Sequence, residues 1–248
     1  MKTMLVSVIT ICYNSEAVIR KTIESVLAQT WGEIEYLIVD GASKDRTVAI
    51  AEEYADRFSE KGYHYRIISE PDQGIYDAMN KGIRCSAGEL IGMINSGDWY
   101  EPDAVETAAK TYEMEPYDLF YADINLVKEN GSIMVKHSKK DRFPTSRHWN
   151  HPTMFVTRKT YDELGLYRNE GIHDDFEFFL RARRAGKKIT IVNRTIANFV
   201  TGGASNAKSF ARCKQRCLDR YRDYRINGYS RLAMIECIAI EAAKFILS

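Results

Sequence analysis

Three apolar segments of the chain end abruptly in polar and acidic residues, and this pattern constrains the fold more than any other. The segments are residues 6–11, followed by Cys12 to Asn14; residues 36–39, followed by Asp40; and residues 90–94, followed by Asn95 to Asp98. Open α/β sheets bind ligands beyond the carboxyl ends of their strands. Acidic side chains there suit a ribose hydroxyl or a metal ion better than a bare phosphate. The pattern therefore predicts a nucleotide held through a divalent cation.

Apolar strands and amphipathic helices alternate through the first part of the chain. We predict strands at residues 5–12, 34–39, 65–69 and 90–94, and helices from Asn14 or Ser15 to residue 29 and over 47–61, 74–84 and 102–114. This alternation is typical of βαβ units around a parallel sheet. Further on, residues 119–127 and 133–136 flank an Asn-Gly turn and predict a hairpin. Residues 154–157, 189–192 and 197–200 predict strands, and 174–185 a helix.

Composition narrows the class of protein. A chain of 248 residues can form one large domain with an appendage, and its net charge of +1 gives no general attraction to nucleic acid. The five cysteines contain no C-x-x-C pair, which argues against a zinc site and favours a reducing compartment. We see no apolar stretch of the ~18 residues that a membrane span needs and no signal region, so we expect a cytoplasmic protein.

The usual phosphate-binding loops are missing. The sequence contains neither G-x-x-x-x-G-K-[ST] nor a G-x-G-x-x-G after the first strand. A metal that bridges the diphosphate is the remaining route to a nucleotide, and oxygen ligands favour Mg²⁺ or Mn²⁺.

Five segments carry a resemblance to a known family: residues 6–14 (VSVITICYN), 39–45 (VDGASKD), 70–82 (EPDQGIYDAMNKG), 94–98 (INSGD) and 173–178 (HDDFEF). In this order they resemble glycosyltransferase family 2, the inverting sugar transferases of GT-A fold. The second is similar to V-D-D-G-S-x-D, the fourth stands at the D-x-D-type metal motif, and the fifth stands at an E-D pair that starts a helix. The third resembles a version common among bacterial polysaccharide transferases.

The resemblance implies a role for each matching residue. Thr10 and Tyr13 would line the base and ribose pocket, Asp40 would bind the nucleoside, and Asp72 would contact the base. Asp98 would coordinate the metal on the diphosphate. Asp175 would be the general base that deprotonates the acceptor hydroxyl, with Asp174 as the alternative because it replaces the usual Glu. Tyr76, Asp77, Trp99 and His151 are candidate substrate contacts.

Some of these residues have structural alternatives. Asp40 can form an Asx turn after its strand, and Asp174 and Asp175 are favoured in the first turn of a helix. Trp99 and Tyr76 can belong to the core, and a lone histidine such as His151 is more often structural. Asn95 and Gly97 replace acids of the metal motif, so Asp98 is its only carboxylate.

The last part of the chain differs from the rest. Seven Lys and Arg lie between Lys208 and Arg225, and a second helix from Arg231 carries an apolar stripe. We predict a catalytic domain over 1–205, with a glycine-rich turn at 201–205 that closes over the diphosphate, and a helical extension over 206–248. The extension is either a solvated helix pair or an element that contacts anionic lipid. The stripe (Leu232, Ile235, Ala239, Ala242 and Ile246) would otherwise pack on the catalytic domain or on a second subunit.

These observations predict a cytoplasmic, metal-dependent, inverting glycosyltransferase that moves a sugar, UDP-linked as in many similar proteins, to a glycan or polyprenyl-linked acceptor. The chain lacks the Q-x-x-R-W motif of processive members, which favours addition of a single residue. Two alternatives stay open. A nucleotidyltransferase would need a glycine-rich loop, and residues 10–15 contain no glycine. A degenerate, non-catalytic nucleotide-sugar-binding module would retain the fold without turnover.

Overall fold

The sheet positions everything else in the molecule. The computed structural model describes residues 3–201 and 210–247, and its strands form one sheet in the order β3-β2-β1-β4-β8-β6-β9-β5, with β7 paired to β6. The first four are parallel, whereas β8 runs antiparallel to β4 and to β6. The strands are β1 (Val6–Cys12), β2 (Ile34–Asp40), β3 (His64–Ser69), β4 (Leu90–Met93), β5 (Trp99–Tyr100), β6 (Leu119–Val127), β7 (Ile133–Lys136), β8 (Phe155–Thr157) and β9 (Ile189–Val200).

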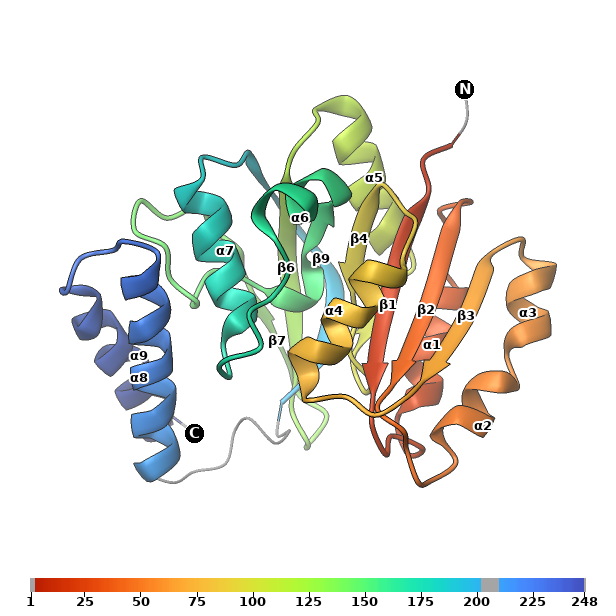
Figure 1. Cartoon of the computed structure of the whole chain (residues 1–248), viewed down its shortest axis with the longest axis horizontal. Helices are drawn as coiled ribbons and strands as arrows, with labels where there is room; N and C mark the ends of the chain where they lie inside the picture. Colours follow the sequence, from red (N-terminus) through yellow and green to blue (C-terminus); the bar gives the residue numbers. More distant parts are fainter. Residues whose placement is uncertain (1–2, 202–209, 248) are drawn as a thin grey trace.

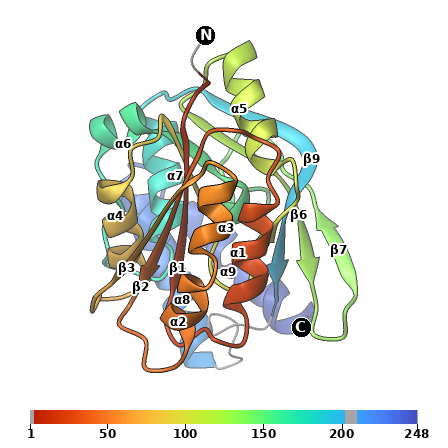
Figure 2. The same cartoon turned by 90° about the vertical axis from the view of Figure 1, so that its right-hand side faces the viewer.

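Helices cover both faces of this sheet, as the alternation predicted (Figures 1 and 2). One core lies under α1 (Ile19–Leu27), α2 (Thr47–Glu52), α3 (Ala55–Glu60) and α5 (Ala104–Met114). The other lies under α4 (Ile75–Cys85), α6 (Arg158–Leu164) and α7 (Asp174–Arg184). Alternate side chains of β1 point into different cores: Val8 belongs to the first and Ile9 to the second, so both faces of the strand are apolar.

Several element boundaries differ from the prediction for local reasons. α1 begins at Ile19 rather than near Ser15, because the Ser15 hydroxyl bonds to Tyr13 O and Ser96 Oγ and does not cap the helix. The helix predicted over 47–61 is two helices, α2 and α3, which meet at Glu53 and Tyr54. The two strands predicted at 189–192 and 197–200 are one strand, β9, whose pairing with β6 shifts register around Asp123. β5, α6 and the single turn η1 (His151–Thr153) were not predicted.

Two C-terminal helices form a separate layer against α7. These are α8 (Phe210–Ile226) and α9 (Ala233–Leu247), at one end of the molecule in Figure 1. The predicted domain boundary at 205/206 and the glycine turn after Thr201 lie outside the described residues. Among the described helices, none combines the length and apolar character that crossing a bilayer requires.

In this layer, the residues that are buried and those that are exposed differ from the prediction. Arg216 and Arg220 of the basic segment are buried and pair with Glu241, so they do not face a lipid surface. In contrast, Leu232 and Ile235 of the apolar stripe are exposed. The expectation that this stripe packs on the catalytic domain is therefore wrong for its described members.

Candidate functional site

A row of polar side chains crosses the carboxyl edge of the parallel strands. The register places Cys12 of β1 beside Asp40 of β2, and Asp40 beside Ser69 of β3. The Ser69 hydroxyl donates to Asp40 Oδ2 at 2.7 Å, and the Cys12 thiol lies 3.7 Å from Asp40 Oδ1. Burial, reinforced by Asp40, raises the pKa of the Cys12 thiol well above its usual range, so this thiol stays protonated and unreactive.

Asp40 is fully buried, and its carboxylate is occupied by the protein. Besides the contacts to Cys12 and Ser69, it accepts hydrogen bonds from the backbone N–H of Ser43 at 2.9 Å and from the Ser43 hydroxyl. The structural alternative was an Asx turn, which joins a side chain to the backbone two residues on; here the carboxylate caps the backbone three residues on instead. Asp40 therefore shapes the loop after β2, and no oxygen of its carboxylate is exposed to a nucleoside in this structure.

Side chains of three loops are linked at this edge. Asn14 N donates to Ser43 Oγ, and Asn14 Oδ1 accepts from Lys44 N, both at 2.8 Å. Ser15 Oγ lies 2.9 Å from Ser96 Oγ in the loop after β4. Asn14 is held at φ 46°, which brings its side chain over the neighbouring loop. These links fix the positions of the loops that follow β1, β2 and β4.

Tyr13 and Asp72, two residues predicted to bind the nucleoside, both lie beside Gly41. Tyr13 exposes 60% of its surface, and Asp72 is half-buried. A Cβ atom built on Gly41 would lie 2.5 Å from Asp72 Oδ2 and 3.4 Å from the Tyr13 ring. The Asp72 carboxylate thus occupies the space of a side chain at position 41. Asp72 Oδ1 also accepts from Gly74 N at 3.0 Å, which leaves Oδ2 facing Gly41 and Tyr13.

Thr10 does not join Tyr13 and Asp72 at this edge. It is fully buried on the face of β1 that also carries Val8, and its hydroxyl accepts a hydrogen bond from Tyr36 at 3.0 Å. Side chains of a strand alternate between the two faces, so Thr10 points away from the side of Ile9 and Ile11. The prediction that Thr10 contacts a base or ribose is therefore wrong, because the residue is part of the core.

Asp98 and Asn95 lie in the turn between β4 and β5. Asp98 is nearly buried, and Oδ1 accepts from Val200 N at 2.9 Å at the end of β9. Burial raises the pKa of Asp98 to about 7, with the Val200 hydrogen bond opposing this shift. Asn95 Oδ1 is buried and has no hydrogen-bond partner among the described residues. These uncommitted oxygens fit a hard cation of the Mg²⁺ or Mn²⁺ type.

This donor set is small, which limits what it can bind alone. No cluster of three or more His, Cys, Asp or Glu that could hold a metal occurs within residues 3–201 and 210–247. A divalent cation at Asp98 would therefore need ligands from diphosphate oxygens and water. The residues fit a metal that arrives with its nucleotide.

The two acids at the start of α7 differ sharply in environment. Asp174 is fully buried; Oδ2 accepts from the N–H groups of Glu170 (2.6 Å) and Gly171 (2.9 Å), and Oδ1 pairs with Arg222 at 3.1 Å. Asp175 is half-buried, and only Oδ1 is engaged, by Tyr76 and by Phe176 N. Asp174 thus holds the loop before α7 against α8, and of the two only Asp175 has an oxygen available to a substrate.

Tyr76 and His151 surround Asp175. The buried Tyr76 hydroxyl lies 3.0 Å from Asp175 Oδ1, so this tyrosine orients the carboxylate rather than stacking on a sugar. His151 Nε2 is buried without a hydrogen-bond partner in the described part of the chain. Burial lowers the pKa of His151 while Asp175 opposes that shift, so the ring is neutral at pH 7. Its ring packs against Trp149 and Tyr167.

Asp77 and Trp99 have structural contacts in this structure. Asp77 Oδ2 accepts from Gln73 N at 3.0 Å and lies 3.6 Å from Lys81 Nζ, so it stabilises the start of α4. The ammonium of Lys21 sits 3.0 Å from the centroid of the Trp99 ring and covers one face of it. These contacts give both residues a structural role, and their contact with a substrate stays a prediction.

The start of α4 connects the two halves of the site. Asp72 and Gly74 form the turn before α4, and Tyr76 in its first turn contacts Asp175. The orientation of Asp175 by Tyr76, the orphaned Asn95 oxygen and the space at Gly41 were not anticipated from the sequence. All three positions lie inside the motifs that the sequence singled out, but which partner each would meet depends on the packing of distant segments.

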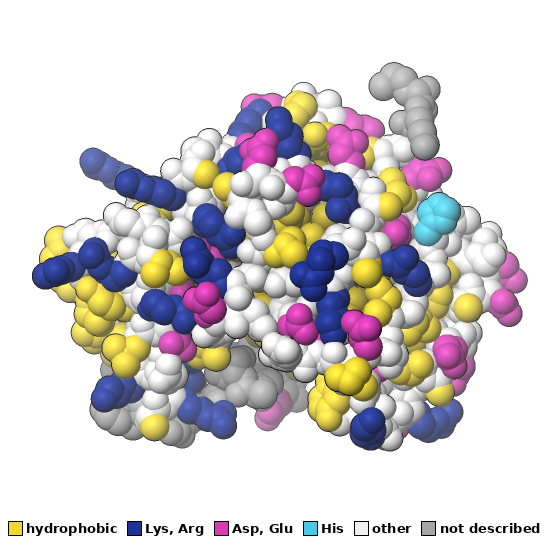
Figure 3. Space-filling view, viewed as in Figure 1, with side chains coloured by type: hydrophobic (Ala, Val, Ile, Leu, Met, Phe, Trp, Pro, Cys, Tyr) yellow, Lys and Arg dark blue, Asp and Glu magenta, His cyan; other side chains and the backbone are white. Residues whose placement is uncertain are grey.

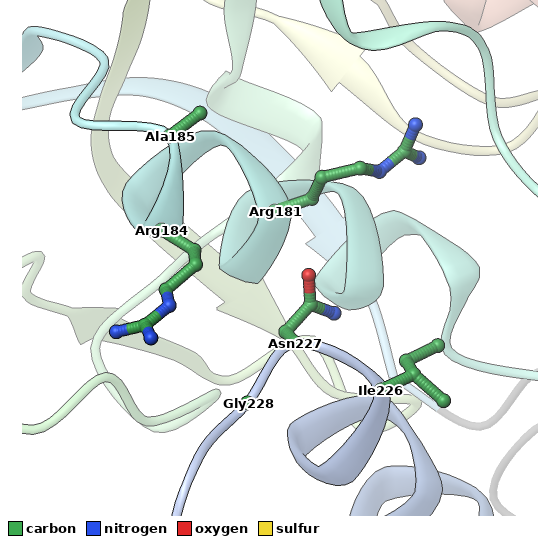
Figure 4. A pocket seen from close by; sticks show the side chains of 6 residues that line it. All are labelled: Arg181, Arg184, Ala185, Ile226, Asn227 and Gly228. Carbon is green, nitrogen blue, oxygen red and sulfur yellow. The ribbon is translucent and has the colours of Figure 1, made fainter.

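A hollow of about 410 Å³ lies elsewhere, between the end of α7 and the end of α8. Arg181 and Arg184 line it, but Figure 4 shows their side chains leaving α7 in different directions. Arg181 is committed to the carbonyls of Leu164 and Leu166 and to Glu177. The hollow is at the opposite end of α7 from Asp174 and Asp175, so it is not the predicted substrate site.

Comparison with known proteins identifies the family. The model of glycosyl transferase family 2 matches residues 7–209, and the chain belongs to that family. It is 31% identical over 188 residues to the PGL/p-HBAD biosynthesis glycosyltransferase of Mycobacterium tuberculosis, which covers 73% of this chain and 70% of that protein. The chain spans only 31% of the length of a further relative from Bacillus subtilis, which is 40% identical over 111 residues.

Solved structures confirm the GT-A fold. TarS 1–349 of S. aureus in complex with UDP-GlcNAc has a TM-score of 0.70 at 17% identity, over 98% of this chain and 73% of that one. The mannosyltransferase PcManGT of Pyrobaculum calidifontis in complex with GDP-Man and Mn²⁺ has a TM-score of 0.67 at 14% identity, over 100% and 71%. The prediction of a mostly parallel α/β sheet with a C-terminal helical appendage is therefore correct.

Proposed function

We propose that this glycosyltransferase transfers a sugar, with inversion, from a nucleotide-sugar donor to a hydroxyl of a glycan or polyprenyl-linked acceptor in polysaccharide biosynthesis. The observation that carries the proposal is the separation of roles at the start of α7. Asp174 is consumed by structural contacts, while Asp175 is oriented by Tyr76 and keeps one carboxylate oxygen available. A half-buried, oriented carboxylate is what a general base for an incoming hydroxyl requires.

The reaction is a single displacement at the anomeric carbon. Asp175 takes the proton of the acceptor hydroxyl as its oxygen forms the new bond to that carbon. The bond from the same carbon to the diphosphate oxygen breaks, and the nucleoside diphosphate leaves on the opposite face, which inverts the configuration. Asp98 would hold a divalent cation, whose positive charge would stabilise the departing diphosphate.

The donor binds at the carboxyl edge of the sheet in this proposal. Tyr13 and Asp72 are the residues we assign to the nucleoside, because they are accessible and adjacent. Asp40 supports them by fixing the loop after β2. A UDP-linked donor is the first to test, since a structural relative was solved with UDP-GlcNAc.

The test is a panel of nucleotide sugars, scored for nucleotide release and for product with Mn²⁺, with Mg²⁺ and with chelator. We expect metal-dependent transfer. NMR should show that the anomeric configuration of the product is opposite to that of the donor. A product that retains the donor configuration contradicts the mechanism. Nucleotide-sugar binding without transfer to any acceptor favours the non-catalytic module. Release of pyrophosphate from a nucleoside triphosphate in the presence of a sugar phosphate favours a nucleotidyltransferase.

A further inference from the structure

The last described helix, α9, exposes aliphatic side chains and turns both of its described glutamates toward the rest of the chain, unlike an ordinary surface helix. The glutamates of α9 point inward: Glu241 is nearly buried and pairs with Arg216 at 2.8 Å and Arg220 at 3.1 Å. Glu236 accepts hydrogen bonds from Tyr224 and Thr145. A helix of a globular protein normally turns its charged residues to solvent and its apolar stripe to the core.

The aliphatic residues of the same segment point outward. Leu232, Ile235 and Ile238 expose 71%, 66% and 56% of their surfaces, and their spacing places them along one side of the helix. Ala239 and Ala242 are exposed beside them. Every exposed residue from the start of α9 to Ala242 is apolar. We call these five residues the α9 face; leaving it in water forgoes the hydrophobic free energy of burial.

Basic side chains border the α9 face. A hollow of about 440 Å³ adjoins it at Ala239 and is lined on its other side by Arg142, Arg147 and His148. The acids of this hollow are already engaged, because Asp141 pairs with His148 at 2.6 Å and Glu236 accepts from Thr145. Within the described part of the chain, the guanidinium groups of Arg142 and Arg147 make no hydrogen bond or ion pair. The border of the face therefore presents two exposed arginines, whereas its acids, Asp141 and Glu236, are half-buried and hydrogen-bonded within the chain.

We propose that the α9 face docks on an anionic lipid surface, with Leu232, Ile235 and Ile238 among the acyl chains and Arg142 and Arg147 at the lipid phosphates. Apolar residues flanked by basic ones are the composition that interfacial elements use. Figure 3 shows hydrophobic side chains gathered over the α8–α9 end of the molecule, with Lys and Arg beside them.

The charge distribution favours lipid over a second copy of the chain. A two-fold dimer places the same patch of both subunits in contact, so the arginines could pair only with acids of that same patch. Asp141 and Glu236 are half-buried and hydrogen-bonded within the subunit. Lipid phosphates are exposed and carry the charge opposite to that of Arg142 and Arg147.

Lipid docking of the α9 face does not depend on the proposed function. The two are linked through α8, which contacts both α9 and the helix that carries Asp175. α8 lies between α9 and α7: α9 pairs with it through Glu241 and Arg216, and α7 through Asp174 and Arg222. Docking of α9 would bring the helix that carries Asp175 close to the lipid surface.

The test is co-sedimentation of the full chain with vesicles of phosphatidylcholine alone or with phosphatidylglycerol, at low and high salt. We expect binding to the anionic vesicles that weakens as salt rises. The double variant Ile235→Glu, Ile238→Glu should bind at least about tenfold more weakly, because each lost aliphatic contact is worth about this factor. The variant Arg142→Gln, Arg147→Gln should lose the preference for anionic lipid. Met114→Glu, at an exposed residue on α5, is the matched control and should bind like the wild type.

Light scattering and circular dichroism complete the experiment. Retained helicity in each variant shows that lost binding is not lost folding, which we expect because the substituted residues are exposed. Three results would overturn the proposal: unchanged pelleting of the Ile235→Glu, Ile238→Glu variant, equal pelleting with neutral and anionic vesicles, or no pelleting together with a dimer that this variant dissociates. The last would make the α9 face an interface between copies of the chain.

Discussion

Single residues in this site are specified by their neighbours more than by their own chemistry. Asp40, Asp98, Asp174 and Asp175 are the same residue type, yet only two of them keep a carboxylate oxygen without a described protein partner. Asp40 and Asp174 receive backbone and side-chain donors from sequence-distant loops and are fully buried. A carboxylate surrounded by donors fixes a loop, whereas one held by a single oxygen can act on a substrate.

At position 41 the site depends on the absence of a side chain. A methyl group at Gly41 would meet Asp72 Oδ2 at 2.5 Å and displace it. The displaced group is the end of a rotatable side chain, so we expect Gly41→Ala to cost little stability but to weaken nucleotide binding about tenfold, the worth of one charge-assisted hydrogen bond. Calorimetry with UDP measures this. Gly32→Ala, where an added Cβ meets nothing, is the control; equal affinity of the two variants would remove Asp72 from the nucleoside contact.

Asp98 should make metal-assisted binding depend on pH. Burial raises the pKa of Asp98 to about 7, so at pH 6 only about a tenth of the molecules carry the ionised ligand. The gain in nucleotide affinity given by Mn²⁺ should therefore be larger at pH 8 than at pH 6, and Asp98→Asn should lose most of it at both. Any pH dependence that remains in Asp98→Asn comes from other groups, such as the nucleotide phosphate, and serves as the baseline. A wild-type gain that matches the variant at both pH values would exclude Asp98 as a metal ligand.

At the scale of elements, the α7–α8 interface is built around buried charge. Asp223 of α8 is fully buried, and burial raises its pKa to about 7, with Arg222 opposing this shift and Asp174 and Glu177 adding to it. One of its oxygens, Oδ2, has no hydrogen-bond partner among the described residues. The interface is therefore more stable when this acid is protonated.

The sign of the pH effect follows from this raised pKa. Between about pH 4 and pH 7 the folded state keeps a proton on Asp223 that the unfolded state has lost, so stability falls as pH rises through this window. Asn mimics the protonated acid. We expect Asp223→Asn to be more stable than the wild type at pH 8, by on the order of 1 kcal/mol, and nearly equal to it at pH 5. Denaturant melts at both pH values test this, with the exposed Asp56→Asn as control; a variant less stable at pH 8 would contradict it.

The elements that the sequence predicted are those with a strong local pattern. The buried parallel strands β1, β2 and β4, the edge strand β3, and α4, α5 and α7 have clear local patterns and lie close to the predicted ranges. β5 is only Trp99–Tyr100 and exists because β9 pairs with it, which no local signal encodes. The predicted start of α1 was wrong because the Ser15 side chain contacts Ser96, a residue distant in sequence, and does not cap the helix.

At the scale of the whole molecule, family and fold could be predicted because ordered motifs carry them. The roles of individual residues could not, since a one-residue offset in a strand moves a side chain to the other face, as for Thr10. The C-terminal layer was the least predictable part. Arg216, Arg220 and Glu241 pair inside this layer, whereas Leu232, Ile235 and Ile238 face outward, a distribution that amphipathicity rules do not predict.

The most direct test of Asp175 as the general base is the sugar-transfer activity of Asp175→Asn, measured beside Asp174→Asn and the surface control Asp56→Asn. Asparagine keeps the hydrogen bond from Tyr76 but cannot accept the acceptor proton. We predict that Asp175→Asn lowers kcat by about 10²–10⁴ with donor affinity and melting temperature nearly unchanged. Asp174→Asn should instead lower the melting temperature, because it weakens the pair with Arg222. Wild-type kcat in Asp175→Asn would contradict the claim that this carboxylate is the base.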